Sequence, residues 1–351
     1  MYWQTLCKIS LLSYFFCNTA YGFAPKCTAN ITPKDNIQHA LDTLPAHQNP
    51  AVLCFAKGKY LVSSFIHIDH NNVILRGKGP STILQLQPKL EQPLIVVGDF
   101  QHQEPAQAIS GIGIENMHLI GDKSVEHEFM PEHPYLSNSV IVVRNGHNIR
   151  MEGLNVEQCR SACLLSEYDS SDILIKNNDV AEAAWDGVSF NRSGKISLIH
   201  NTIHDNAAAG ITTEHLVDSF ITDNTISNNK SSGIYLSDST NNRITNNLIK
   251  NNTISGILFT CAIRQRTPEV LCWDNSVSQN NRVENNRFVG NPHSYTLGVD
   301  RAARCNYPGF IKNFWRYNRS DSTGLFPPVQ EYGVCVDSDE KQTPAPNTPD
   351  K

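Results

Sequence analysis

The sequence predicts an all-β protein: a single-stranded right-handed parallel β-helix with three strands per coil, about 23 residues per coil and a short N-terminal capping helix. Two residue columns with a 23-residue period predict the repeat, one of glycine and one of asparagine. The apolar residues between them alternate with polar residues, which is the spacing of strands and not of helices.

The glycine and asparagine columns define the coil. Each glycine precedes an apolar β-branched residue, and each asparagine stands in a polar cluster; the columns are Gly187, Gly210, Gly233, Gly256 and Asn178, Asn201, Asn224, Asn247. Three short strands separated by polar corners make one coil, and coils stack at the strand spacing of about 4.8 Å. We expect the asparagine side chains to stack at a corner and to bond backbone groups that the bend would otherwise leave unpaired.

Residues 1–22 predict a cleaved signal peptide. Lys8 precedes the apolar run from Ile9 to Phe16, and Ala20-Tyr21-Gly22 has the small-x-small pattern of a cleavage site. The run is too short for a bilayer core, which needs about 20 apolar residues. The sequence therefore predicts a secreted or periplasmic protein without a membrane span.

Eight cysteines remain after cleavage, and an oxidising compartment favours disulfide bonds between them. Pairing of sequence neighbours suits a fold with local contacts, but it is one of 105 connectivities that eight cysteines allow. Structural cystines are favoured over a zinc site because no C-x-x-C occurs. We expect no cofactor and no metal, although the His and Glu residues between 126 and 133 leave a metal site open as a minor alternative.

The net charge of −5 argues against a nucleic-acid partner, because phosphate contacts need a basic surface. It leaves open an acidic polysaccharide held by a local basic groove, and a monomer is expected. Thr32-Pro33-Lys34-Asp35 reads as a capping box that begins the helix, and Pro45 ends it. The predicted order along the chain is signal peptide 1–22, cap and first coils 23–120, loop insertion 121–137, regular coils 138–291 with a second insertion at 260–276, C-terminal cap 292–336 and disordered tail 337–351.

The repeat resembles that of a known group of proteins. The run from Ser232 to Ile249, SGIYLSDSTNNRITNNLI, is similar to the repeat of periplasmic NosD-type proteins and mannuronan C5-epimerases, which are pectate-lyase-like β-helices. The repeat covers about residues 138–291, and the segments Asn36 to Pro45, Lys57 to Val62 and Val73 to Leu84 resemble the N-terminal part of that superfamily. The resemblance is specific for the fold and implies no single activity, because both enzymes and non-enzymes carry this repeat.

Candidate functional residues come from the outward positions of the glycine-led strands. Counting from the glycine, the second and fourth positions face outward, and we expect Glu167 to fall inward unless the register slips near 164–172. Cleaving or epimerising a uronate needs a cation for its carboxylate, a base for the C5 proton and an acid on the opposite side. The catalytic candidates on this exposed face are Arg144, Tyr168, Arg192, Glu214 and His215.

Substrate-binding candidates lie on the same face and in the second insertion. Asn191 and Tyr235 occupy outward positions, and the second insertion supplies Arg264, Arg266 and Trp273 as a wall of the groove. The two insertions precede and follow glycine-led strands, so both flank this face. The alternative interpretation is a solvated polar face with no ligand, which any β-helix carries.

The resemblance both supports and limits an enzymatic function. In the epimerases an acidic residue stands in the column of Glu214, whereas their Asp-Pro-His-Asp/Glu motif would fall on Ser189–Arg192, where it is not kept. Two hypotheses follow. The protein binds and modifies an acidic polysaccharide, as a lyase or epimerase before a hydrolase, or it is a non-catalytic glycan-binding or NosD-like periplasmic accessory protein.

Overall fold

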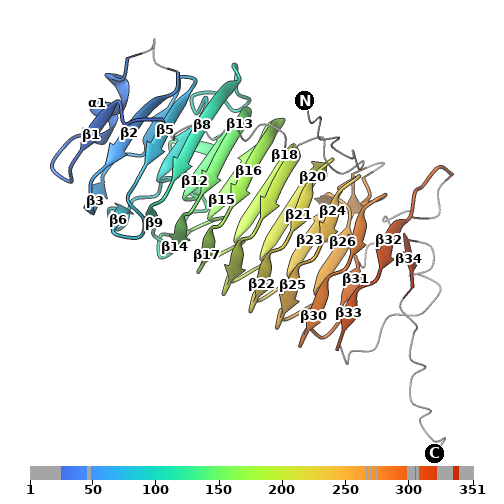
Figure 1. The fold of residues 1–351 in the computed structure, drawn as a ribbon. Helices are drawn as coiled ribbons and strands as arrows, with labels where there is room; N and C mark the ends of the chain where they lie inside the picture. The colour runs from blue at the N-terminus through green and yellow to red at the C-terminus, as the bar shows by residue number, and fades with distance from the viewer. Residues whose placement is uncertain are drawn as a thin grey trace, which may run out of the picture.

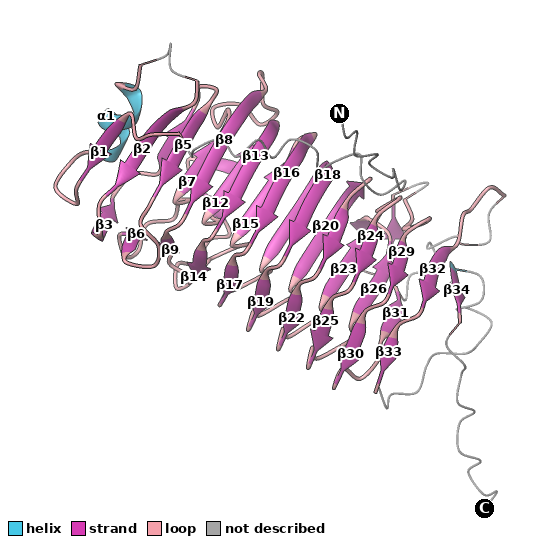
Figure 2. Cartoon of the chain, in the orientation of Figure 1, coloured by secondary structure: helices cyan, strands magenta, loops and turns pink. Residues whose placement is uncertain are grey.

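The computed structural model describes residues 25–45, 49–265, 268, 271–273, 276–298, 305, 308–321 and 335–339. These residues form a stack of coils that runs from α1 (Ile37–Asp42) at one end to β34 (Val336–Ser338) at the other (Figures 1 and 2). The predicted right-handed parallel β-helix with a helical cap is confirmed. The predicted signal peptide lies outside the described residues, as does the predicted tail from residue 340 onward; β34 extends into that tail.

Each full coil contributes one strand to each of three parallel ladders. The glycine-led strands form the first ladder: β4 (Ile66–Ile68), β7 (Ile95–Val97), β12 (Ile141–Arg144), β15 (Leu164–Glu167), the first half of β18 (Val188–Ile199), β20 (Ile211–Val217), β23 (Ile234–Ser237), β26 (Ile257–Thr260) and β31 (Tyr295–Leu297).

The second ladder follows the first after a bend. It contains β1 (Ala29–Ile31), β2 (Ala51–Phe55), β5 (Val73–Arg76), β8 (Ile109–Glu115), β13 (Gly146–Glu152), β16 (Ser170–Lys176), the second half of β18, β21 (Phe220–Thr222), β24 (Arg243–Thr245), β29 (Arg282–Glu284), β32 (Asn313–Arg316) and β34.

The third ladder closes each coil. It contains β3 (Gly58–Val62), β6 (Thr82–Leu86), β9 (His118–Ile120), β14 (Asn155–Glu157), β17 (Asp179–Ala181), β19 (Thr202–His204), β22 (Thr225–Ser227), β25 (Leu248–Lys250), β30 (Arg287–Val289) and β33 (Arg319–Ser320).

The core lies inside the coils and is built by the inward positions of all three ladders. In the first ladder Val188, Ile211 and Ile234 are fully buried, because alternate side chains of a strand point to the same side. At the glycines that precede β18, β20, β23 and β26, the coil has no room for a side chain. A Cβ at Gly210 would lie 2.6 Å from a methyl carbon of Ile226 and 2.8 Å from the amide nitrogen of Asn229.

Three stacks of buried asparagine side chains hold the corners. The predicted column forms an unbroken ladder at the bend between the second and third ladders, with each amide nitrogen donating to the next amide oxygen at 2.9–3.0 Å: Asn178, Asn201, Asn224, Asn247, Asn286, Asn318. Two shorter stacks repeat the arrangement at the other bends: Asn206, Asn229, Asn252, Asn291 and Asn242, Asn281, Asn313. The bends therefore bury no orphaned amides where these stacks run.

The cap helix begins four residues later than the sequence predicts. Asn36 is its N-cap, with its side chain accepting from the backbone N–H of His39 at 2.9 Å. The predicted capping pair forms a separate turn ahead of the helix, because Asp35 accepts from both the backbone and the hydroxyl of Thr32. Leu41 is fully buried against the first coils and covers the open end of the core.

Two antiparallel hairpins interrupt the stack. The first joins β10 (Phe129–Met130) to β11 (His133–Ser137), and the second joins β27 (Ile263–Gln265) to β28 (Leu271–Cys272). All four cystines join sequence neighbours: Cys27–Cys54, Cys159–Cys163, Cys261–Cys272 and Cys305–Cys335. The third closes the second hairpin at its base.

The substitution Asn224→Ala tests how much the asparagine ladder contributes to the stability of the fold. The side chain of Asn224 accepts two hydrogen bonds from Asn201 and donates to Leu198 and Asn247, so its loss strands several buried groups. At about 1–3 kcal/mol for each stranded group, we expect the free energy of unfolding to fall by about 3 kcal/mol. Urea unfolding, monitored by circular dichroism, measures this change in the free energy of unfolding. The matched control is Asn155→Ala, on a half-buried strand position of β14, which should change the midpoint little.

Candidate functional site

The register of the first ladder differs from the predicted one at a single coil. Leu164 pairs with Val188, 24 residues on, whereas Val188 pairs with Ile211, 23 residues on. The extra residue is taken up at the following bend, where both Tyr168 and Asp169 have positive φ. The anticipated slip therefore occurs. Because of it, Glu167 points outward, in register with Arg144, and not inward.

Arg144 does not lie on the exposed face, where the sequence analysis expects it. Its side chain is fully buried; the guanidinium donates to the Glu167 carboxylate at 2.7 Å and to the backbone carbonyls of Asp99, His102 and Gln103. These bonds fasten the loop between β7 and β8 over the outer face of the ladder. Arg144 thus has a structural role that occupies its donors.

Tyr168 lies between two cations at the bend. The guanidinium carbons of Arg144 and Arg192 are 4.9 Å and 4.4 Å from its ring centroid. Arg192 itself is exposed, so the stack holds a cation at the edge of the face without using its hydrogen-bond donors. Burial raises the pKa of Glu167, although the Arg144 charge opposes that shift.

The N-terminal part of the outer face is closed by apolar contacts. Val96, Val142 and Leu165 point outward from successive strands and are buried beneath Leu136 of the first hairpin. Phe100 and Tyr135 complete this cover. The open part of the face therefore begins at β18.

From β18 onward the outer face of the first ladder is polar and accessible. Ser189, Thr212 and Tyr235 are half-buried in one row, and Asn191 and Glu214 stand in the next. His215 follows Glu214 at the bend and contacts the Asp238 carboxylate at 3.2 Å. The structure thus brings Asn191, Glu214 and Tyr235 onto one surface.

The second hairpin follows β26 of the same ladder. Trp273 is 58% exposed, and the guanidinium carbon of Arg264 is 6.0 Å from its ring centroid. Arg266, the third candidate of this insertion, lies outside the described residues. The first hairpin precedes β12, so the open strands β18, β20 and β23 lie between the two insertions in the stack.

Asp186 is a candidate that sequence reasoning did not select. It directly precedes Gly187, is only 5% exposed, and accepts hydrogen bonds from the Ala209 backbone and the Thr212 hydroxyl. Burial, helped by the charges of Glu128 and Glu214, raises the pKa of Asp186 to about 6 against these hydrogen bonds. Among the described residues, no lysine or arginine forms an ion pair with Asp186. A buried carboxyl without a cation is costly and marks functional sites more often than chance.

A sequence signal for Asp186 exists in the repeat. One residue before the glycine, the following coils carry only small side chains, Ala209, Ser232 and Ser255. A carboxylate in this column is therefore an exception to the repeat. Its neighbour Trp185 is 52% exposed on the same bend, which places an accessible indole beside the buried carboxyl.

The described residues offer little to a metal ion. No group of three or more His, Cys, Asp or Glu among them is arranged to hold one, and the eight described cysteines are all in disulfides. Of the described methionines, Met117 and Met151 are buried in the core, and Met130 on β10 packs against the apolar cluster around Leu136. Nor is any helix of the described part long and apolar enough to cross a membrane.

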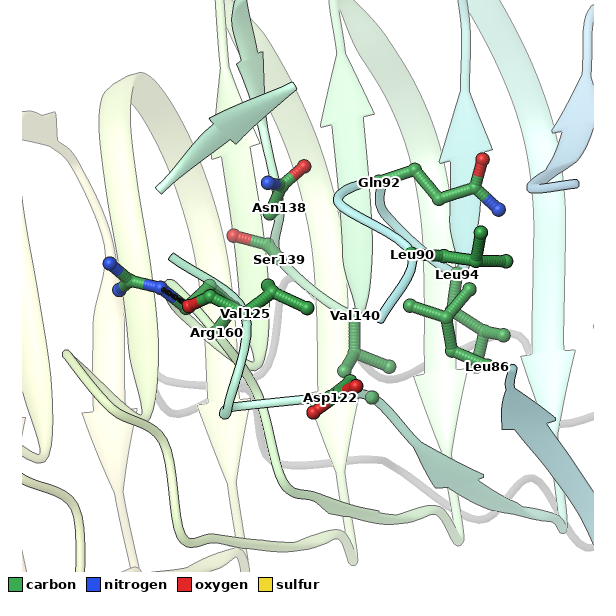
Figure 3. A pocket seen from close by; sticks show the side chains of 11 residues that line it. Leu86, Leu90, Gln92, Leu94, Asp122, Val125, Asn138, Ser139, Val140 and Arg160 are labelled. Carbon is green, nitrogen blue, oxygen red and sulfur yellow. Dashed lines mark hydrogen bonds between the residues drawn. The ribbon is translucent and has the colours of Figure 1, made fainter. Parts of the chain in front are cut away.

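A small pocket lies at the bend between the third and first ladders, below the first insertion (Figure 3). Its lining combines leucines of residues 86–94 with Asp122, Val125, Asn138 and Arg160. Arg160 donates to the Val125 carbonyl at 2.7 Å and so secures the insertion to the coil. We therefore assign this pocket to the packing of the insertion.

Asp186→Asn should stabilise the protein at neutral pH. Because the pKa of Asp186 is raised, the folded state binds the proton more tightly, and stability falls as the pH rises from about 4 through 6. Above that range the variant should gain roughly 2–3 kcal/mol over wild type, and at pH 4 the gain should vanish. Urea unfolding at pH 4 and pH 7.5 measures this, with the exposed Asp218→Asn as control. An equal effect at both pH values would contradict the assignment.

Several solved structures share the fold at low sequence identity. The A-module of a mannuronan C-5 epimerase from Azotobacter vinelandii is 15% identical over 87% of this chain and 95% of its own, with a TM-score of 0.51. The surface adhesin PfbA of Streptococcus pneumoniae is 12% identical over 86% and 78%, with a TM-score of 0.62. A family 28 exopolygalacturonase of Yersinia enterocolitica is 14% identical over 86% and 67%, with a TM-score of 0.55.

These likenesses establish the β-helix architecture, and no curated protein sequence matches the chain. The profile of the family described as "Periplasmic copper-binding protein (NosD)" matches residues 109–316, more than half of the chain. This match confirms the resemblance carried by the 23-residue repeat, and the periplasmic family agrees with the predicted secreted or periplasmic location. The chain belongs to the NosD family of periplasmic β-helix proteins.

Proposed function

We propose that the protein binds a polysaccharide along the open outer face of the first ladder and exchanges protons with it through Asp186 and Glu214. The single observation that carries this proposal is the buried carboxyl of Asp186. It has no cationic partner among the described residues, and the charge of the exposed Glu214 carboxylate helps to raise its pKa. A buried carboxyl with a raised pKa can act as an acid toward a ligand, and an exposed carboxylate on the same face can act as the base. Solved β-helices include an epimerase and an exopolygalacturonase, which supports a polysaccharide as the ligand.

The reaction class that we favour is proton transfer at a uronate, by elimination or epimerisation. Asp186 retains its proton near pH 6 and is the proposed acid, and Glu214 or His215 is the proposed base. Arg192, held against Tyr168, is the proposed cation for the uronate carboxylate. Asn191 and Tyr235 are proposed to bind the neighbouring sugars, with Trp185, Trp273 and Arg264 at the rims.

A non-catalytic role is the second candidate, as a glycan-binding or NosD-like accessory protein. The structural role of Arg144 favours it, because the loop carbonyls and Glu167 use the donors that a uronate carboxylate would need. The missing epimerase motif at Ser189–Arg192 favours it as well.

Copper appears in the family description, yet the described residues do not fit it. Copper(I) selects thiolate and thioether ligands, and the copper(II) ion needs several imidazoles or carboxylates in close array. The cysteines are paired and the described methionines are packed in apolar clusters. We therefore assign no step to copper.

Proton NMR of polyuronates incubated with the mature protein tests the proposal. Alginate, polygalacturonate and glycosaminoglycans each report unsaturated ends, new reducing ends or inverted C5 centres in one spectrum. We expect a changed spectrum for at least one of them, with the rate falling at least 100-fold in Asp186→Asn and in Glu214→Gln, as for loss of a general acid or base.

Asp218→Asn, an exposed carboxylate on the bend that follows β20 and one that the proposed mechanism does not use, is the matched control and should retain the full rate. A spectrum that stays unchanged while the ligand lines broaden would reject the catalytic step and favour the glycan-binding role. An equal rate in all three variants would remove Asp186 and Glu214 from the mechanism.

A further inference from the structure

The outer face of the second ladder carries an arginine–phenylalanine row that the proposed function does not use. Phe220 pairs with Arg243, Arg243 with Arg282, and Arg282 with Phe314, so the four residues stand on successive strands β21, β24, β29 and β32. The residues that follow each of them, such as Ile221 and Trp315, are fully buried. By strand alternation the row points outward.

The row is accessible. Phe220 is 43% exposed, the side chain of Arg282 is 48% exposed, and Arg243 is exposed as well. The exposed ring of Phe220 and the half-buried ring of Phe314 add apolar surface at the two ends of the row. In the C-terminal half of the stack, Figure 1 labels β21, β24 and β32, and Figure 2 labels β29 between β24 and β32.

Each arginine of the row lies over a phenylalanine ring. The guanidinium carbon of Arg282 is 4.8 Å from the Phe314 centroid, and that of Arg243 is 5.9 Å from the Phe220 centroid. Such stacking fixes the guanidinium plane and leaves its N–H groups for an outside acceptor. Arg243 makes no ion pair with a described carboxylate, and Arg282 has only a 3.5 Å contact with Glu284.

Charge distinguishes this surface from the first-ladder face. The outward positions of β21, β24, β29 and β32 hold Arg243, Arg282 and Arg316 against the single acid Glu284. Arg316 is paired with Asp337, so Arg243 and Arg282 are the cations left for a ligand. The whole chain carries −5, and the first-ladder face presents Glu214 and Asp186.

We propose that this row is a second binding surface, for a linear polysaccharide that carries carboxylate groups. Arg243 and Arg282, one coil apart, bind carboxylates on the polymer by charge-assisted hydrogen bonds, for which the planar guanidinium is suited. Phe220 and Phe314 flank them and offer apolar rings to the C–H faces of the sugars. A carboxylated polysaccharide is preferred over nucleic acid because the protein is acidic and belongs to a periplasmic family.

Calorimetric titration of the mature protein with galacturonate oligomers at low ionic strength tests the proposal. Each charge-assisted contact contributes about tenfold, so the Arg243→Ala/Arg282→Ala variant should bind about 100-fold more weakly. The Arg243→Lys/Arg282→Lys variant keeps the charge and should lose only part of the affinity. Circular dichroism should show equal melting for all variants.

The matched control is Arg287→Ala/Arg319→Ala, which removes two exposed arginines stacked on the third ladder of the same coils. It makes the same change in net charge and should bind as wild type does. Asp186→Asn/Glu214→Gln alters only the first-ladder face and should also retain this binding, which separates the second surface from the proposed acid–base site.

Three results would overturn the proposal. The first is no binding of galacturonate oligomers by the wild-type protein. The second is equal weakening in the Arg287→Ala/Arg319→Ala control, which would indicate diffuse charge. The third is tighter binding of a single-stranded DNA oligomer that depends on Arg243 and Arg282, which would identify nucleic acid as the ligand.

Discussion

The hydrogen bonds between stacked asparagine amides are the constraint on which the rest of the structure depends. A coil of three short strands needs three sharp bends, and each bend withdraws backbone N–H and C=O groups from the ladders. A buried asparagine amide donates a hydrogen bond to the asparagine of the next coil and accepts one from the asparagine of the previous coil. A single residue type can therefore serve every coil. The stack from Asn178 to Asn318 does this across six coils. Strand register is fixed as a consequence.

With the register fixed, each outward row becomes a straight line of side chains one coil apart. The first-ladder face then divides into an apolar part, covered by Leu136 and Tyr135, and an open polar part with Glu214. The second-ladder face gathers arginine and phenylalanine. One short repeat thereby carries two chemically different surfaces around the same core.

Most of the fold could be predicted from the sequence, because the glycine and asparagine columns report directly on packing. The candidate functional site was harder to predict from the sequence. The extra residue at Tyr168 and Asp169 moves Glu167 outward, and no columnar pattern shows which residue of a bend absorbs an insertion. Arg144 stands outward as expected, but only the structure reveals the loop from Asp99 that buries it. Asp186 was visible as an exception in a column of small residues, yet its burial depends on three-dimensional contacts.

The identity of the bends has a consequence for how such a protein can change over time. Because every coil between Gly187 and Gly256 presents the same amide socket above and below, a whole 23-residue unit could be duplicated or lost with its hydrogen bonds remade. Such an event would lengthen or shorten both outer surfaces by one rung and leave the rungs on either side intact. The length of polymer that such a surface can contact is thus set by the number of coils, and it changes in steps of one coil.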